Sequence, residues 1–347
     1  MQFLDRRPPQ CAGQACGVLK HYAIRAGGCA NQKGPLMIDP NIAAVLQKLN
    51  AGPAIESMDA PEQRQFFRAM RSTPTPLPGV ESRDFQIETG EALLNVRLLS
   101  PVHGPDETDE LPCLVYFHGG GWMVGGLDTH DQSGRRLALG TGIKVLLVAY
   151  RLAPENRFPA AHDDALASTS WLFDHARELG VDPTRIAVGG ESAGANMAAY
   201  VATELGDQPG KRCALQLLFY PMAQVDIDTA SRRKFAEGLF VTLGLHTRCM
   251  ETYLESDSQR TDPRISILLR EDLSHSPPAF IAVGGNDIFL DENKMYADRL
   301  TSAGVRVEYQ EYPSLIHGFC GFYDLAAEVR TAFDDASQAL RRAFHRD

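Results

Sequence analysis

Short apolar segments alternate with longer amphipathic segments over most of the 347-residue chain. The short segments are of the kind that buried parallel strands supply. Six of them are expected to be strands: 112–117, 143–149, 185–189, 213–219, 279–283 and 305–310. Helices are expected at about 161–179, 193–205, 291–303 and 323–344. This alternation predicts an α/β fold, with a mostly parallel central sheet flanked by helices.

Two helices and a hairpin are predicted ahead of that alternation. Asp39-Pro40 supplies an N-cap followed by proline at the first helical position, and apolar residues recur behind it with helical spacing. Asp59 and Glu62 form a capping-box-like start for the second helix. The segments 85–88 and 93–99 flank Thr89-Gly90 and predict an antiparallel hairpin. The two helices have no sheet partner, so they can pack as a core stripe, line a substrate cleft, or do both.

A second departure from the alternation lies between Pro221 and Pro277, where about 55 residues pass without a strand. An insertion there, together with the first two helices, would form a helical cap over the sheet. The expected organisation is an N-terminal extension (1–34), cap helices (35–78), the first part of the core (79–222), a cap insertion (223–276) and the second part of the core (277–347).

The first 34 residues differ from the rest of the chain. They hold three of the seven cysteines, Asp5 is their only acidic residue, and they show no amphipathic period. Lys20 interrupts the apolar core that a signal peptide would need, and the absence of serine disfavours a transit peptide. We expect a disordered or adventitious extension, with Met37 as an alternative start.

Composition narrows the class of protein. The formal net charge of −10 argues against nucleic acid or an anionic membrane surface as the main partner, and no apolar run is long enough for a transmembrane helix. The seven cysteines form no C-x-x-C pair and show no metal-ligand spacing, and their odd number favours reduced thiols. No Asn-x-Ser/Thr acceptor occurs either. These features fit a cytoplasmic protein without a metal site.

Candidate chemistry centres on Ser192. Gly190-Glu191-Ser192-Ala193-Gly194 follows an apolar strand, precedes a helical segment and matches the G-x-S-x-G elbow of serine hydrolases. Such a pentapeptide arises by chance in roughly one chain of this length in ten, so its partners decide its meaning. A glycine-rich loop, His118 to Trp122, lies upstream, and Asp287 and His317 lie downstream. The order Ser, Asp, His is that of the α/β-hydrolases.

These motifs, with several others, resemble those of the bacterial hormone-sensitive-lipase-like esterases (family IV) of the α/β-hydrolase fold. The resemblance runs from about Asp39 to the C-terminus. It rests on His118-Gly119-Gly120-Gly121-Trp122, Tyr150-Arg151-Leu152-Ala153-Pro154-Glu155, Phe158-Pro159-Ala160-Ala161-His162-Asp163-Asp164-Ala165, Gly190-Glu191-Ser192-Ala193-Gly194, Asp262-Pro263-Arg264-Ile265-Ser266 and His317-Gly318-Phe319. Two departures are visible: Glu191 stands where the family commonly has Asp, and Asp287-Ile288-Phe289-Leu290-Asp291 replaces the usual Asp-Pro-Leu-x-Asp.

Roles for the triad follow from this order of motifs. Ser192 is the expected nucleophile, His317 the base and later the acid, and Asp287 the residue that orients the imidazole. Asp291 is the alternative acid, although its place at a helix start makes N-capping its more ordinary explanation.

The remaining site residues support the triad. The Ala193 N–H is expected to donate to the oxyanion, and the resemblance adds Gly120 and Gly121, with Gly119 as a further candidate. His118 is expected to fix the loop, and Glu191 to brace the elbow. The substrate pocket is expected to include Trp122, Phe66 and Phe240.

The leading hypothesis is therefore a cofactor-independent serine carboxylesterase acting on short- to medium-chain acyl esters, with a small-molecule ester as its partner. An amidase or lactonase on the same fold is the alternative. A non-catalytic ligand receptor is disfavoured because His317 is retained. A homodimer stays open as the oligomeric state.

Overall fold

The computed structural model describes residues 37–71, 77–102 and 110–345. Residues 1–34, expected as an extension, therefore lie outside the described residues. The strands are β1 Val80–Glu88, β2 Leu93–Pro101, β3 Leu111–Phe117, β4 Lys144–Ala149, β5 Val181–Glu191, β6 Gln216–Phe219, β7 Ala279–Asn286 and β8 Val307–Ile316. The helices are α1 Pro40–Leu49, α2 Ala60–Arg71, α3 Leu127–Thr141, α4 Ala160–His175, α5 Ala193–Gly206, α6 Ala230–Lys234, α7 Leu243–Tyr253, α8 Leu290–Ser302 and α9 Ala327–Phe344.

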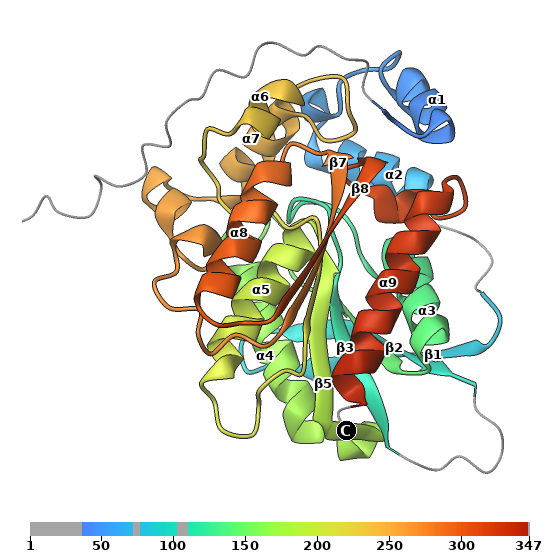
Figure 1. The fold of residues 1–347 in the computed structure, drawn as a ribbon, viewed down its shortest axis with the longest axis vertical. Helices are drawn as coiled ribbons and strands as arrows, with labels where there is room; N and C mark the ends of the chain where they lie inside the picture. Colours follow the sequence, from blue (N-terminus) through green and yellow to red (C-terminus); the bar gives the residue numbers. More distant parts are fainter. Residues whose placement is uncertain (1–36, 72–76, 103–109, 346–347) are drawn as a thin grey trace, which may run out of the picture. The chain divides into compact units, whose positions relative to one another are not determined.

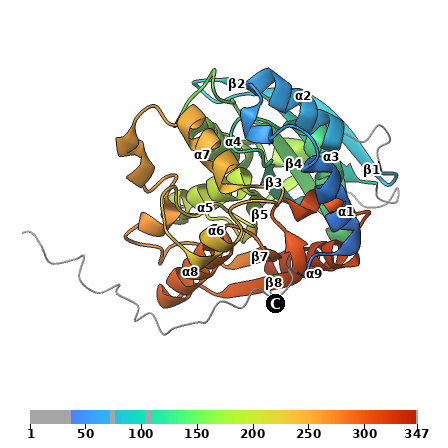
Figure 2. The same ribbon diagram turned by 90° about the horizontal axis from the view of Figure 1, so that it is seen from above.

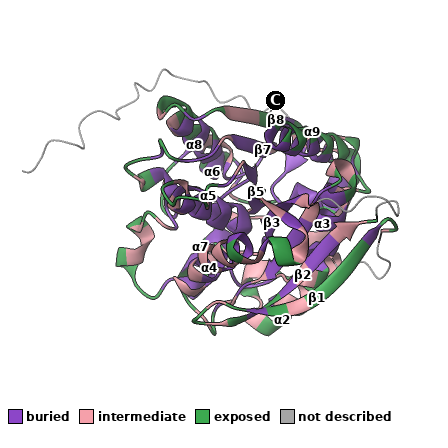
Figure 3. Cartoon of the chain, turned by 90° about the horizontal axis from the view of Figure 1, so that it is seen from below, coloured by how far each residue is buried: buried purple, intermediate pink, exposed green. Residues whose placement is uncertain are grey.

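The strands form one eight-stranded sheet in the order β1-β2-β4-β3-β5-β6-β7-β8. The β1–β2 and β2–β4 pairs are antiparallel, and every later pair is parallel. α3 and α9 pack together on one side of the sheet, while α4, α5 and α8 lie on the other (Figure 1). Burial is concentrated in the central strands and α5, whereas much of β1 is exposed (Figure 3). The expected α/β fold, with a mostly parallel sheet flanked by helices, is confirmed.

Helices α1, α2, α6 and α7 gather beyond the carboxyl ends of the parallel strands, and we call them, with their connections, the cap (Figures 1 and 2). Both predicted starts of the first two helices are confirmed. The Asp39 carboxylate accepts from the Asn41 amide at 2.9 Å. Asp59 and Glu62 each bond the other's backbone amide, at 2.8 and 3.0 Å, as a capping box.

The N-terminal part of the cap is bonded to its inserted part. The Asn50 side chain donates to the Gly238 carbonyl at 3.0 Å, and the Thr242 hydroxyl donates to Glu56 at 3.2 Å. Segments far apart in the sequence thus form one wall above the sheet. No helix in the described part of the chain is long and apolar enough to cross a membrane.

Some predicted boundaries were wrong. The last strand was expected at 305–310, but β8 continues to Ile316 and pairs with β7 across an irregularity between Gly284 and Asn286. Pro313 and the polar residues beside it hide this extension from a hydrophobicity pattern. As a consequence, His317 comes directly after a strand and does not follow a loop.

Two helix boundaries also differ. The predicted helix 161–179 ends at His175 and is followed by a 3₁₀ turn at Arg177–Leu179. The last helix begins at Ala327, four residues later than predicted, because residues 323–325 form a turn that follows the 3₁₀ helix Phe319–Phe322.

Candidate active site

Ser192 occupies the turn between β5 and α5 with φ of 55° and ψ of −118°. An L-residue rarely adopts a positive φ, and such a conformation costs on the order of 1–3 kcal/mol unless the surroundings hold it. The two flanking glycines make the turn possible. A Cβ on Gly190 would lie 2.5 Å from the Phe117 carbonyl oxygen, and one on Gly194 would lie 2.0 Å from the same atom. The G-x-S-x-G pattern is therefore a steric requirement of this turn.

The three predicted triad residues lie together. The His317 Nε2 is 2.8 Å from the Ser192 hydroxyl, and its Nδ1 is 2.8 Å from an Asp287 carboxylate oxygen. The other Asp287 oxygen accepts from the Phe289 amide at 2.8 Å, which fixes the carboxylate. Asp287 and His317 are buried. With Nδ1–H donating to Asp287, the free Nε2 lone pair faces the serine hydroxyl and can accept its proton.

Asp291 does not reach this triad. Its carboxylate accepts from the Ser231 backbone amide of α6 at 2.8 Å. The prediction that it caps a helix was also wrong, since α8 already begins at Leu290 and its N-cap is Phe289. Asp291 instead joins α8 to the cap insertion.

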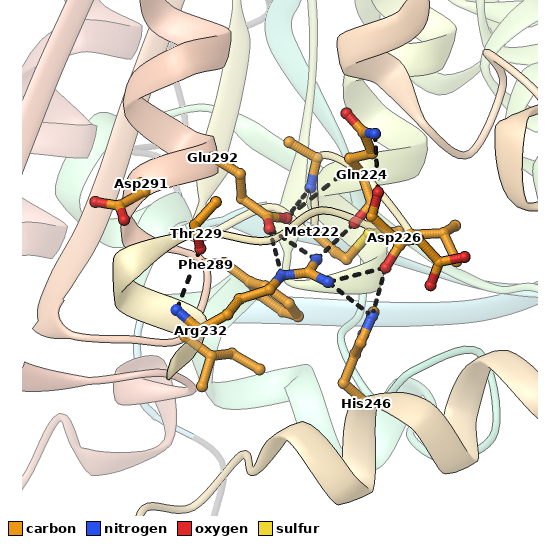
Figure 4. A network of polar contacts seen from close by, with 12 residues as sticks. Met222, Gln224, Asp226, Thr229, Arg232, His246, Phe289, Asp291 and Glu292 are labelled. Carbon is orange, nitrogen blue, oxygen red and sulfur yellow. Dashed lines mark hydrogen bonds and ion pairs between the residues drawn. The ribbon is translucent and has the colours of Figure 1, made fainter. Parts of the chain in front are cut away.

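A buried ion pair reinforces that junction (Figure 4). Arg232 of α6 donates to the Glu292 carboxylate of α8 at 2.7 Å, and the Ala223 amide donates to the same carboxylate at 2.7 Å. Burial raises the pKa of the Glu292 carboxyl to about 7, against the lowering effect of the Arg232 charge. The cap insertion is thereby attached to the first turn of the helix that follows Asp287.

The glycine-rich loop after β3 makes a tight turn. Gly120, Gly121 and Trp122 all have positive φ, and the Gly120 carbonyl accepts from the Met123 and Val124 amides at 3.1 Å each. Within the described part of the chain, the Gly120 and Gly121 amides have no protein partner. These two amides are therefore free to donate to a substrate oxygen.

Gly119 differs from its neighbours. Its amide donates to the His130 Nε2 at 3.3 Å. Burial lowers the pKa of His130 well below its ordinary value, so the ring is neutral and this nitrogen can accept. Because its N–H is already used, we do not retain Gly119 as an oxyanion donor.

His118 holds the loop from beneath. Its ring stacks on Tyr150 at 4.1 Å between centroids, and the Tyr150 hydroxyl donates to the His118 carbonyl at 2.8 Å. The His118 Nδ1 lies 2.9 Å from the Gly119 carbonyl oxygen. Burial lowers the pKa of His118 to about 4, so the ring is neutral at physiological pH.

Glu191, directly before the nucleophile, is fully enclosed by polar partners. Arg71 of α2 donates two hydrogen bonds to it, at 2.9 and 3.1 Å, and the hydroxyls of Tyr220 and Tyr116 donate at 2.8 and 3.2 Å. Burial by itself would raise the pKa of Glu191, but the Arg71 charge and these bonds lower it to about 2. The charge is thus kept in a buried place and anchors the elbow to α2.

Neither Arg71 nor a second polar chain, behind Trp122, was predicted from the sequence. Trp122 stacks on Tyr253 of the cap at 4.8 Å, and the Tyr253 hydroxyl lies 2.8 Å from the His162 Nδ1. The other His162 nitrogen bonds the Asn196 side chain of α5 at 3.0 Å. In the sequence, only the family motif that contains His162 marks this group of polar residues. The spacing of residues in that motif does not indicate a particular chemistry.

A cavity of about 100 Å³ opens over Ser192. The predicted pocket residues Trp122, Phe66 and Phe240 all line it. Among the described residues, the charged side chains in its wall other than histidine are Arg71 and Glu191, and these neutralise each other. No group of acidic, histidine or cysteine side chains among the described residues is placed to hold a metal ion.

Comparison with known proteins identifies the family. Residues 114–321 match a family model described as the α/β-hydrolase fold. The carboxylesterase NlhH of Mycobacterium tuberculosis is 37% identical over 287 residues, covering 81% of this chain and 89% of the relative. The ethyl acetate hydrolase of Pseudomonas putida is 33% identical over 320 residues, covering 88% of this chain and 99% of the relative.

Solved structures agree with these relatives. A thermostable esterase from Pseudomonas putida superimposes with a TM-score of 0.84 at 29% identity, covering 90% of this chain and 100% of that one. An α/β-hydrolase from the metagenome of Lake Arreo does so with a TM-score of 0.84 at 34% identity, covering 89% of this chain and 99% of that one. The chain belongs to the hormone-sensitive-lipase-like (family IV) esterases of the α/β-hydrolase fold and is a carboxylic ester hydrolase.

The Glu191 site predicts a pH-dependent contribution to stability. The carboxyl has a pKa of about 2 in the folded protein against 4.5 for an ordinary glutamate, so its contribution is present above pH 4.5 and is lost as the pH falls toward 2. Glu191→Gln should lower the free energy of unfolding by about 3 kcal/mol at pH 7. Urea unfolding should show this difference shrinking below pH 4.5. A difference independent of pH, or one matched by the exposed control Glu237→Gln, would contradict the assignment.

The elbow sterics predict the effect of a single methyl group. Gly194→Ala would place a Cβ against the Phe117 and His118 carbonyl oxygens. These are backbone atoms, which can shift only at a high cost in free energy. We expect a loss of about 3 kcal/mol or more in stability. Gly52→Ala is the control, since its Cβ would meet only the Leu49 carbonyl at 3.4 Å. Equal melting temperatures for the two variants would show that the elbow tolerates a side chain there.

Proposed function

We propose that this protein hydrolyses short- to medium-chain acyl esters with uncharged acyl and alcohol groups, through an acyl-enzyme formed on Ser192. One observation carries the proposal: the hydrogen-bonded chain from Asp287 through His317 to the Ser192 hydroxyl, with both links at 2.8 Å, lies against an apolar cavity. The names of the relatives, a carboxylesterase and an ethyl acetate hydrolase, support an ester as the substrate.

In the first half-reaction, the Ser192 oxygen attacks the ester carbonyl carbon while its proton passes to the His317 Nε2. The carbonyl oxygen becomes an oxyanion and accepts hydrogen bonds from the amides of Gly120, Gly121 and Ala193. Losing one such donor typically costs about 3–4 kcal/mol of transition-state stabilisation. The carbon–oxygen bond to the alcohol then breaks, and the imidazolium returns the proton to the leaving alkoxide.

In the second half-reaction, a water molecule gives its proton to His317 and attacks the acyl carbon. The tetrahedral intermediate collapses, Ser192 regains its proton from the imidazolium, and the carboxylic acid leaves. Asp287 keeps its charge throughout and stabilises the imidazolium in both halves. No cofactor enters either step.

The cavity supports the substrate class. Most of the side chains that line it are apolar, as is usual in sites that bind small uncharged ligands. Since the two charged groups in its wall are paired with each other, a charged substrate group would enter without a partner and lose its hydration. Neutral acyl and alcohol groups meet no such penalty.

An amidase or lactonase remains the alternative, since the same triad can attack an amide or a lactone. A non-catalytic receptor is disfavoured because His317 lies in hydrogen-bond contact with Ser192.

A panel of p-nitrophenyl esters from acetate to palmitate, with the matching butyranilide, tests the proposal. We expect activity to peak at short or medium acyl chains and to fall by about 10⁴-fold or more in Ser192→Ala. An optimum at palmitate would overturn the chain-length assignment. Comparable hydrolysis of the anilide would favour the amidase, and activity that survives in Ser192→Ala would remove Ser192 as the nucleophile.

A further inference from the structure

Helix α2 of the cap presents two arginines, Arg64 and Arg71, to the catalytic machinery. They are seven residues apart, about two helical turns, and therefore lie on one face of the helix. Arg71 bonds Glu191 next to the nucleophile, as described above. Arg64 bonds the other half of the machinery, the turn that carries the free glycine amides.

Arg64 connects three groups on two chain segments. Its Nε donates to the Met123 carbonyl at 2.9 Å, and one terminal nitrogen donates to the Ala153 carbonyl at 2.8 Å. Both terminal nitrogens also bond the Glu155 carboxylate, at 2.8 and 2.6 Å. The Ala153 amide in turn donates to the Trp122 carbonyl at 2.9 Å. The guanidinium thus locks Trp122 and Met123, directly after Gly121, against the segment that follows β4.

A further contact from the same helix reaches the start of the loop. The Phe67 ring stacks on His130 at 6.0 Å, and His130 accepts the Gly119 amide. Helix α2 therefore reaches the loop on both sides of Gly120 and Gly121, directly at Met123 and through His130 at Gly119. The Gly120 and Gly121 amides lie between these fixed points.

The energetic role of Arg64 differs from that of Arg71. The side chains of Arg64 and Glu155 are 27% and 57% exposed, so solvent screens their ion pair and the pair contributes little to stability. Arg71 and Glu191 are almost wholly buried, and breaking that pair should destabilise the whole fold. Removing the guanidinium therefore loses little through the ion pair, but it also takes a donor from the buried Met123 and Ala153 carbonyls. Melting temperatures measured beside the acylation rates separate that loss of stability from the effect on the loop.

We propose that Arg64 is a positioning residue for the reaction: it acts through the Met123 and Ala153 carbonyls to hold the Gly120 and Gly121 amides in the orientation that the oxyanion requires. The inference rests on the proposed function. It makes α2 a fixed part of the active site and not a lid that leaves the loop during turnover. Without the guanidinium, substrate still binds in the apolar cavity, but the oxyanion meets amides that are less well aligned.

The test compares Arg64→Met with wild type in stopped-flow acylation by p-nitrophenyl butyrate. The acylation rate constant should fall about tenfold, less than the full loss of an oxyanion donor, while the substrate dissociation constant stays within about twofold. A trifluoromethyl ketone binds as an oxyanion adduct of Ser192, and its affinity for Arg64→Met should fall by a similar factor. Arg64→Lys should retain part of the rate, because one ammonium can bond one of the two carbonyls.

Two matched variants separate the positioning effect of Arg64 from the effect of its ion pair and from the effect of removing any positive charge from α2. Glu155→Gln keeps Arg64 and both of its carbonyl bonds, and Arg68→Met removes an exposed arginine of the same helix. Both should acylate within about twofold of wild type, with melting temperatures for all variants within a few degrees.

If the wild-type enzyme is active, any of three results would overturn this inference and leave the proposed function standing. These are an unchanged acylation rate in Arg64→Met, a fall in that rate that its unfolded fraction explains, or an equal fall in Glu155→Gln. A folded wild type that neither hydrolyses the ester nor reacts with the ketone would instead overturn the proposed function, and the inference would fall with it.

Discussion

The backbone of Ser192 is the constraint on which the rest of the site depends. Its positive φ exposes the hydroxyl above the carboxyl end of the sheet, at a cost that only the surrounding structure can offset. The offset comes from close packing and from charge. Gly190 and Gly194 let the Phe117 backbone approach, and the buried Glu191 carboxylate is held by Arg71 and two tyrosine hydroxyls. The strained turn, the close backbone packing and the buried ion pair therefore all involve the five residues from Gly190 to Gly194.

The cap takes part in this arrangement as well as covering it. Arg71 and Arg64 extend from α2 to the elbow and to the glycine loop, and Arg232 attaches the cap insertion beside the helix that follows Asp287. The elbow, the glycine loop and the helix that follows Asp287 are thus each bonded to a part of the cap. A site built in this way is preorganised, because its donors and its base need not be assembled after the substrate enters.

Much of this could be predicted from sequence, because the informative features are local. The elbow and the glycine loop are each recognised from a few consecutive residues. The order of Ser192, Asp287 and His317 along the chain then indicates the fold. What could not be predicted depends on pairing across the molecule. Arg64 and Arg71 look like ordinary charged residues of an amphipathic helix, and only the packed structure shows that they face the loop and the elbow. Gly119 looked like an oxyanion donor until the structure placed His130 against its amide.

The most direct test of the account is to identify the residue that carries the acyl group. Wild-type protein mixed with p-nitrophenyl butyrate and quenched in acid within milliseconds should show a mass increase of one butyryl group, located on Ser192 by peptide mapping and absent in His317→Gln. The cavity wall also contains a thiol, Cys249, which offers an alternative nucleophile. An acyl group on Cys249, or rapid turnover with no adduct at all, would contradict the account.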